Sequence, residues 1–390
     1  MQSIPQDSCR NIRKSLAVAA RVIVSALNLA ACGQHVERAN DIINREFIRE
    51  EKDFPYARCM ESGLDFLARN ADADNWLLQI EPFDPHEPFY APARFREAFP
   101  TDYRGPVLDW PRYGGVDELR EECEELRANY YATVAHCDEL LGRLLDVFDA
   151  RDFWQDTALV VTTDHGFLLG EHDFWAKNRM NLYREVEHIP LLVHDPRVPA
   201  RPGESCAALT QTIDLAATFL DLFNVAPTPN MEGIPLRLTR DGSHRREALI
   251  FGYFGGAVNV TDGRFTYHRF PPDLRRQEIY QYTLMPTHII MPFTVEELAD
   301  IRIAGPLPFT KGAKVMQVPV IERSPMFERY GPGALLENET RLYDLAADPG
   351  QARPVRDVET EARLVELMRC LMLANDAPAE AFVRLQLTPP

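Results

Sequence analysis

A long helical pattern followed by an apolar strand constrains this fold more than any other feature of the sequence. Residues Asp117–Ala150 place apolar side chains near helical spacing, and the stretch DTALVVTTDHG that follows has the apolar run and final glycine of a buried strand. Trp76–Phe83 is a second predicted strand, earlier in the chain. A strand, a helix and another strand in this order predict an α/β domain around a central, mostly parallel or mixed sheet flanked by helices.

The rest of the chain completes this domain and adds a smaller region. HIPLLVHDP, residues 188–196, predicts another buried strand, and TQTIDLAATFLDLF after it predicts a helix. After Gly233, apolar and polar residues alternate around turn signals such as Asp262-Gly263, which predicts antiparallel strands, and a helix is predicted around Glu359–Asn375. We therefore expect a leader or packing helix over residues 1–35, the α/β domain over 36–245, and a C-terminal α+β region over 246–390.

The first residues allow two interpretations. Arg10, Arg13 and Lys14 precede an apolar run that ends in LAAC at Cys32, which has the form of a lipoprotein cleavage site. Arg21 interrupts the run, and the remainder is shorter than the ~20 residues that span a bilayer. We favour a helix that packs on the core over a lipid anchor at Cys32, expect no transmembrane span, and leave a cytoplasmic or a periplasmic location open.

Charge and cysteine pattern exclude several classes of protein. The formal net charge is -17, and no basic run with interleaved aromatic residues occurs, so a nucleic-acid partner is not predicted. The 7 cysteines are odd in number and never form C-x-x-C, which argues against a disulfide framework and a zinc knuckle.

The chemistry-bearing residues gather after the strand predicted within DTALVVTTDHG. Asp164 and His165 lie at its C-terminal end, where open α/β sheets bind their ligands. A carboxylate oxygen and an imidazole nitrogen from adjacent residues can share one divalent ion if the chain turns there, and Gly166 makes the turn easier. Mixed oxygen and nitrogen ligands favour calcium, magnesium or manganese over a thiolate zinc site. Lys177 and His172 follow closely.

His86 lies on DPHEPFYAP, a loop that three prolines make rigid. If the preceding strand neighbours the strand before Asp164, then His86 and Lys177 converge with the metal ligands. Such a set would neutralise a tetrahedral ester anion and donate a proton to its departing oxygen. His172 is a candidate substrate ligand, although we favour a helix-capping or supporting role. His288, in the loop TLMPTH, is a further candidate for the crevice, as is the loop FTKG.

Several linked segments resemble the sulfatase family of the alkaline phosphatase superfamily. They are, in order, FDPHEPF, YYATVAHCDELLGRLLDVF, DTALVVTTDHGFLLGEHDFWAKN, HIPLLVHDP, MEGIPLRL and LYDLAADP. The resemblance implies that Asp164 and His165 match the second pair of metal ligands, and that Lys177 and His86 hold the sulfate and assist departure of the leaving group. It implies a small-molecule or saccharide sulfate ester as substrate, a formylglycine nucleophile, and Ca²⁺ as the metal, with Mn²⁺ or Mg²⁺ as alternatives.

Other family motifs do not occur in the sequence. The missing motifs are an Asp-Asp pair followed by C-x-P-S-R or C-x-A-x-R, and a later Gly-Lys-Trp-His segment. The nearest match to the cysteine motif is the stretch from Cys9 to Arg13. We interpret this match as chance, because Asn11 stands where the motif has Pro or Ala. Two ligands fall short of the ~6 to 8 oxygens that calcium prefers. We therefore expect an N-terminally truncated sulfate ester hydrolase with an incomplete sheet. The alternatives are a phosphonate monoester or phosphodiester hydrolase and a non-catalytic pseudoenzyme.

Overall fold

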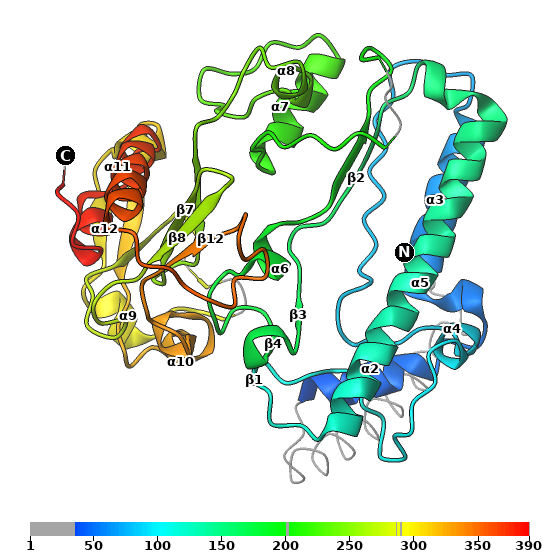
Figure 1. The fold of residues 1–390 in the computed structure, drawn as a ribbon, viewed down its shortest axis with the longest axis horizontal. Coiled ribbons are helices and arrows are strands. Elements are labelled where there is room, and N and C mark those ends of the chain that lie inside the picture. Colours follow the sequence, from blue (N-terminus) through cyan, green and yellow to red (C-terminus); the bar gives the residue numbers. More distant parts are fainter. Residues whose placement is uncertain (1–35, 200–202, 286, 289–290, 390) are drawn as a thin grey trace, which may run out of the picture. The chain divides into compact units, whose positions relative to one another are not determined.

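The computed structural model describes residues 36–199, 203–285, 287–288 and 291–389 (Figure 1). The expected leader or packing helix over residues 1–35, including Cys32, lies outside the described residues. The chain divides into two compact units. The first unit is Met1–Pro111 with Glu118–Phe153, and the second unit is Arg112–Asp117 with Trp154–Pro390. Residues on both sides of the expected boundary at 245 therefore share the second unit.

The regular elements described in the first unit are all helical. Its elements are α2 (Val36–Arg45), η1 (Glu51–Asp53), α3 (Pro55–Arg69), α4 (Ala93–Glu97) and α5 (Arg120–Arg151). Helix α5 confirms the long helix predicted for Asp117–Ala150. Its buried positions include Leu126, Leu140 and Phe148, whereas Val134, which falls on the predicted apolar face, is 37% exposed. The periodicity predicted the helix, but the neighbouring segments decided which side of it is buried.

The strand predicted at Trp76–Phe83 is wrong, since these residues form no strand in the structure. Their side chains do alternate between shielded and exposed, and Leu77 and Phe83 are 60% and 63% exposed. Alternating burial is the local signature of a strand, but a strand also requires a hydrogen-bonded neighbour. The sequence pattern therefore predicted the side-chain arrangement and not the pairing.

The strands of the second unit that the structure describes pair only in antiparallel fashion. The parallel neighbours that we expected in the central sheet are not among these pairs. The sheets, each in spatial order, are β2 (Leu159–Thr162) with β5 (Leu191–His194); β1 (Gly114–Gly115), β4 (Phe174–Ala176) and β3 (Leu168–Leu169); β10 (Arg302–Ala304), β11 (Val315–Pro319) and β9 (Tyr280–Thr283); and β12 (Arg341–Asp344), β8 (Phe265–Arg269), β7 (Val258–Thr261) and β6 (Leu249–Gly252).

The helices of the second unit include both predicted ones, α7 (Ile213–Leu222) and α11 (Val358–Ala374). Among the residues that the structure describes, no helix combines the length and the apolar character needed to cross a bilayer. The other helical elements after α5 are η2 (Phe153–Gln155), which begins at the boundary of the units, η3 (Glu171–Asp173), α6 (Arg184–Glu187), α8 (Leu236–Arg240), α9 (Val295–Ala299), η4 (Pro308–Thr310), α10 (Pro325–Tyr330), η5 (Pro332–Ala334) and α12 (Ala379–Arg384).

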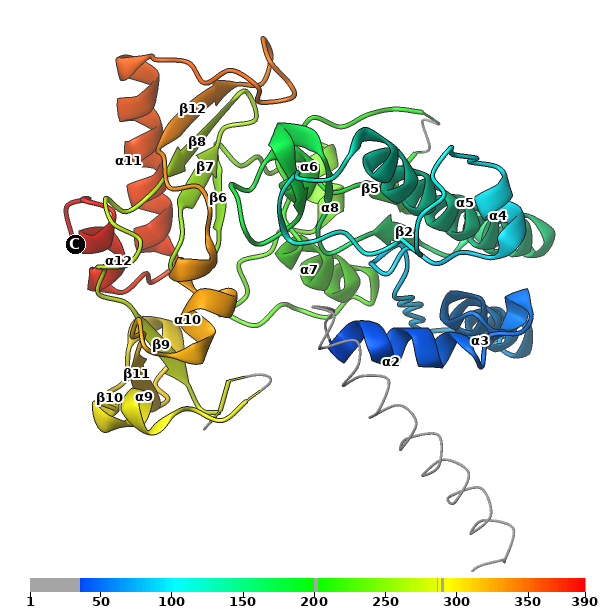
Figure 2. The same ribbon diagram turned by 90° about the horizontal axis from the view of Figure 1, so that it is seen from below.

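The sheet β12-β8-β7-β6 has buried side chains on both faces. Helix α11 covers one face (Figure 2), where Tyr267 packs in one cluster with Leu364. Strand residues alternate between faces, so His268 points to the other face. There it is buried among the rings of Tyr183 and Tyr343. This second face is thus closed by the segment around Tyr183, which also leads into α6.

Candidate metal and ester site

Asp164, His165 and Lys177 come together in the second unit. The Nε2 atom of His165 lies 3.4 Å from Asp164 Oδ2 and 3.2 Å from Lys177 Nζ. The other ring nitrogen, Nδ1, lies 3.0 Å from the carbonyl oxygen of Gly166. A carbonyl oxygen can only accept, so Nδ1 carries the proton and Nε2 keeps a lone pair. The imidazole is therefore held in the form that can accept from an ammonium group or bind a metal ion.

The β3–β4 hairpin returns Lys177 toward the end of β2. Leu168 pairs with Ala176 in antiparallel register, which places Phe167 opposite Lys177. The Lys177 ammonium lies 5.9 Å from the centre of the Phe167 ring, within the range of a cation–π contact. Ala176 and Asn178, on either side of the lysine, have φ values of 73° and 69°. This left-handed backbone is unfavourable for residues with a side chain, so the surrounding fold must hold Lys177 in place.

The carboxylate of Asp164 is the exposed member of the group. Partial burial raises the pKa of Asp164. The attraction of His165 and a hydrogen bond from the backbone N–H of His165 at 2.9 Å outweigh this effect, so the pKa lies below its ordinary value. The side chain is 80% exposed, whereas Lys177 is buried. A charged and accessible carboxylate thus lies beside the Nε2 lone pair of His165.

Gly166 has a different function from the one that we expected. Its backbone is not in the left-handed region, so the turn itself does not require glycine. Its N–H donates to the carbonyl oxygen of Val186 at 2.8 Å, and a Cβ at this position would lie 1.8 Å from the carbonyl oxygen of Glu185. The missing side chain therefore allows the backbone of α6 to pack directly against the residue after His165.

His172 contacts α6 and the residue before it. Its ring stacks on Tyr183 with 3.6 Å between the ring centres and 6° between the planes. Its Nε2 atom lies 3.3 Å from Glu185 Oε2, and the side chain is 10% exposed. Burial raises the pKa of Glu185, but the hydrogen bond with His172 and other contacts lower it by more. The described contacts of His172 are thus with Glu185 of α6 and with Tyr183, and its supporting role stays a prediction.

His86 lies in the first unit, on the proline-rich loop, as expected. Its Nδ1 atom is 2.7 Å from the carbonyl oxygen of Glu87, and its ring centre is 4.3 Å from that of Phe83. Burial raises the pKa of the nearby Asp84 to about 6. The loop therefore carries a shielded acid and a histidine that is held by its neighbours.

Two other regions differ from the candidate site. His288 is buried, its Nε2 lies 2.8 Å from Glu297 Oε1, and its ring packs on Phe293, so it belongs to the fold around α9.

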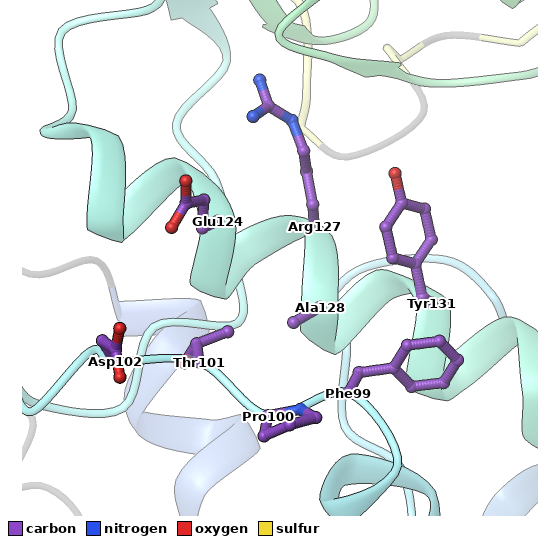
Figure 3. Close-up of a pocket in the computed structure, with 8 residues that line it drawn as sticks. All are labelled: Phe99, Pro100, Thr101, Asp102, Glu124, Arg127, Ala128 and Tyr131. Atoms are coloured by element: carbon purple, nitrogen blue, oxygen red, sulfur yellow. The ribbon is translucent and has the colours of Figure 1, made fainter.

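A surface hollow of about 520 Å³ lies in the first unit beside α5 (Figure 3). None of the predicted site residues lines it; its lining is Phe99, Pro100, Thr101, Asp102, Glu124, Arg127, Ala128 and Tyr131.

The distance between Asp164 Oδ2 and His165 Nε2 allows both atoms to bind one divalent ion. Oxygen ligands of calcium lie ~2.3 to 2.6 Å from the ion, so two ligands of one ion are at most ~5 Å apart. The separation of 3.4 Å between Asp164 Oδ2 and His165 Nε2 meets this condition. Within the described ranges, no group of three or more His, Cys, Asp or Glu side chains could hold a metal. The pair therefore offers two donor atoms that are close enough to share one ion.

Sequence reasoning missed two residues that hold the segment between Lys177 and α6. The Tyr253 hydroxyl accepts from the N–H of Asn178 at 3.3 Å. The Glu337 carboxylate accepts from the N–H of Asn181 at 2.9 Å and from the Tyr183 hydroxyl at 2.8 Å. No local pattern marks these residues, because their contacts are 75 and more than 150 positions away in the chain.

The sulfatase family model matches residues 38–225 of the chain. Choline-sulfatase of Rhizobium meliloti (strain 1021) is 25% identical over 229 residues, which are 52% of this chain and 44% of that protein. Arylsulfatase K of Xenopus laevis is 34% identical over 161 residues, which are 41% of this chain and 28% of that protein. The chain thus spans less than half the length of these curated relatives.

Two solved structures have the same fold. A protein from Bacteroides fragilis described as a sulfatase matches with a TM-score of 0.56 and 14% identity, over 85% of this chain and 61% of its own. The phosphonate monoester hydrolase of Silicibacter pomeroyi matches with a TM-score of 0.54 and 19% identity, over 84% and 62%. These likenesses confirm the predicted α/β fold class, and at such identities they concern the fold alone.

Proposed function

Because the sulfatase family model matches residues 38–225, we propose that this chain is a member of that family and acts in the hydrolysis of sulfate esters with a divalent metal ion. The observation that supports this proposal most is the position of His165 Nε2, within 3.4 Å of the Asp164 carboxylate and 3.2 Å of the Lys177 ammonium. A metal ion needs ligands such as the Asp164 carboxylate and the neutral His165 imidazole, and an anionic ester needs a cation such as Lys177. All three groups meet here.

Asp164 and His165 would hold the ion, with Ca²⁺ as our first candidate and Mn²⁺ or Mg²⁺ as alternatives. When bound, the ion would neutralise charge on the sulfate oxygens and polarise the sulfur centre. The Gly166 carbonyl keeps the His165 proton on Nδ1, so that Nε2 is available as a ligand.

Lys177 would bind the sulfate and stabilise negative charge as the ester bond breaks. Its burial strengthens this interaction, because a charge in a shielded site is less screened than one in water. For His86, the resemblance alone supports our proposal that it donates a proton to the departing oxygen, as an imidazole can act as a general acid. Residues 76–83 before it form no strand, so the strand argument made from the sequence does not support this role. The substrate would be a small-molecule or saccharide sulfate ester, as we predicted from the resemblance.

The residues of this chain do not fit a formylglycine nucleophile. The cysteines that the structure describes, among them Cys123 and Cys137 on α5, are not followed by the family's pattern. We therefore assign no step to formylglycine.

The experiment is a metal and hydrolysis assay of the 390-residue chain and of Asp164→Ala, with Asp156→Ala as the matched control. Asp156 is an exposed aspartate of the same unit whose carboxylate contacts Thr157. We expect Asp164→Ala to lose hydrolysis of 4-nitrophenyl sulfate and at least about tenfold in affinity for Mn²⁺ or Ca²⁺, since one of two protein ligands is gone. Isothermal titration calorimetry measures the affinity, and Asp156→Ala should match the wild type.

The outcomes separate the alternatives. Faster hydrolysis of phenyl phosphonate monoesters than of the sulfate ester would favour the phosphonate hydrolase that shares this fold. Stoichiometric metal binding that depends on Asp164, without hydrolysis of either ester, would favour a pseudoenzyme. A chain that binds no metal and hydrolyses neither ester would show that the proposal is wrong.

A further inference from the structure

We infer that His172 is a positioning residue that sets the orientation of the His165 imidazole through helix α6. The inference rests on the proposed function only in taking His165 as a group that must be positioned for chemistry. The contacts that carry it lie wholly within the second unit.

Helix α6 needs support from side chains, because it has only 4 residues. A single helical turn fixes many backbone angles for few hydrogen bonds and is unstable alone. Side chains contact it at three places among the described residues: the Tyr183 hydroxyl donates to Glu337 at 2.8 Å, the N–H of Arg184 donates to the Gln351 side chain at 2.6 Å, and His172 contacts Glu185 and Tyr183. Of these side chains, His172 is the one that comes from the segment between His165 and Lys177.

The backbone of His172 indicates that its position is imposed by the fold. His172 and Asp173 have φ values of 56° and 61°, in the left-handed region. This conformation costs roughly 1 kcal/mol or more for a residue with a side chain, and it persists only where other contacts offset it. Stacking on Tyr183 and pairing with Glu185 are such contacts.

The effect passes from α6 to His165 through Gly166. The carbonyl oxygen of Val186 accepts from the Gly166 N–H at 2.8 Å, and the carbonyl of Glu185 packs against the Gly166 Cα atom so closely that no side chain fits. The Gly166 carbonyl in turn accepts from His165 Nδ1 at 3.0 Å. A shift of α6 therefore moves the group that determines which ring nitrogen of His165 carries the proton.

The test uses His172→Phe, which keeps a ring over Tyr183 and removes the partner of Glu185. We expect amide hydrogen exchange in the peptide 164–168 to accelerate about tenfold, the usual effect of losing one hydrogen bond to a charged group. We also expect the ¹⁵N signals of the His165 ring, assigned by their loss in His165→Gln, to change from the Nδ1–H tautomer to a mixture. A purely structural residue would not alter the tautomer. Neither readout depends on metal or turnover, so a failed sulfatase proposal leaves the test intact.

His188→Phe is the matched control, because His188 follows α6 directly, is exposed, and forms no hydrogen bond or ring contact with Tyr183 or Glu185 among the described residues. It should leave exchange and tautomer unchanged. If His172→Phe does not fold, Glu185→Gln should give the same changes to a smaller extent, because an amide oxygen is a weaker acceptor. Wild-type exchange of 164–168 and a wild-type His165 signal in a folded variant would overturn the inference.

Discussion

Replacing Gly166 with alanine is expected to destabilise the second unit by about 3 kcal/mol, at the upper end of the range for overpacking. The added Cβ would lie 1.8 Å from the carbonyl oxygen of Glu185 and 3.2 Å from Val186 Cα. Both atoms belong to the backbone of α6, so no side-chain rotation can relieve the clash. Either the helix or the Asp164-His165 turn must move.

Calorimetry checks this prediction as a fall of roughly 6 to 12 °C in Tm for the second unit. Gly115→Ala is the control in the same unit, because the nearest atom to its Cβ, the carbonyl oxygen of Asp173, would be 3.8 Å away. It should change the free energy of unfolding by no more than about 0.5 kcal/mol. Equal Tm values for Gly166→Ala and the wild type would mean that α6 does not pack against the turn.

The second large effect is a loss of stability in acid that depends on His268. Burial lowers the pKa of His268 from 6.5 to about 3, and the nearby Arg341 and His172 add to the decrease. Between these two values the unfolded chain binds a proton that the folded chain does not bind. The contribution of His268 is therefore favourable above pH 6.5 and is lost as the pH falls, by about 1.4 kcal/mol for each pH unit down to pH 3.

Urea unfolding between pH 7 and pH 4 measures this dependence. His268→Phe should unfold with a shallower pH dependence, whatever its stability at pH 7, because phenylalanine cannot be protonated. His244→Phe removes an exposed histidine and should keep the slope of the wild type. Parallel curves for His268→Phe and the wild type would contradict the prediction.

Local periodicity predicted those elements whose signal lies within a few residues. Helices α5 and α11 and strands β2 and β5 form close to their predicted positions, and the turn at Asp262-Gly263 joins β7 to β8. Each depends on neighbouring side chains or on one glycine, here with a φ of 89°. Strand partners depend on distant residues, which explains why Trp76–Phe83 is unpaired and β2 runs antiparallel to β5.

The sequence alone predicts the α/β class, the resemblance to the sulfatase family, and the presence of Asp164, His165 and Lys177 after a strand. The way in which these residues are held follows from contacts that form on folding. His165 Nδ1 contacts the Gly166 carbonyl, and Gly166 packs against the backbone of α6. His172 contacts Glu185 of α6, and Glu337 contacts Tyr183 just before it. Residue types can be read directly from the sequence. Hydrogen bonds and close backbone contacts, in contrast, form between groups that are distant in the chain, such as Tyr183 and Glu337, which are 154 positions apart.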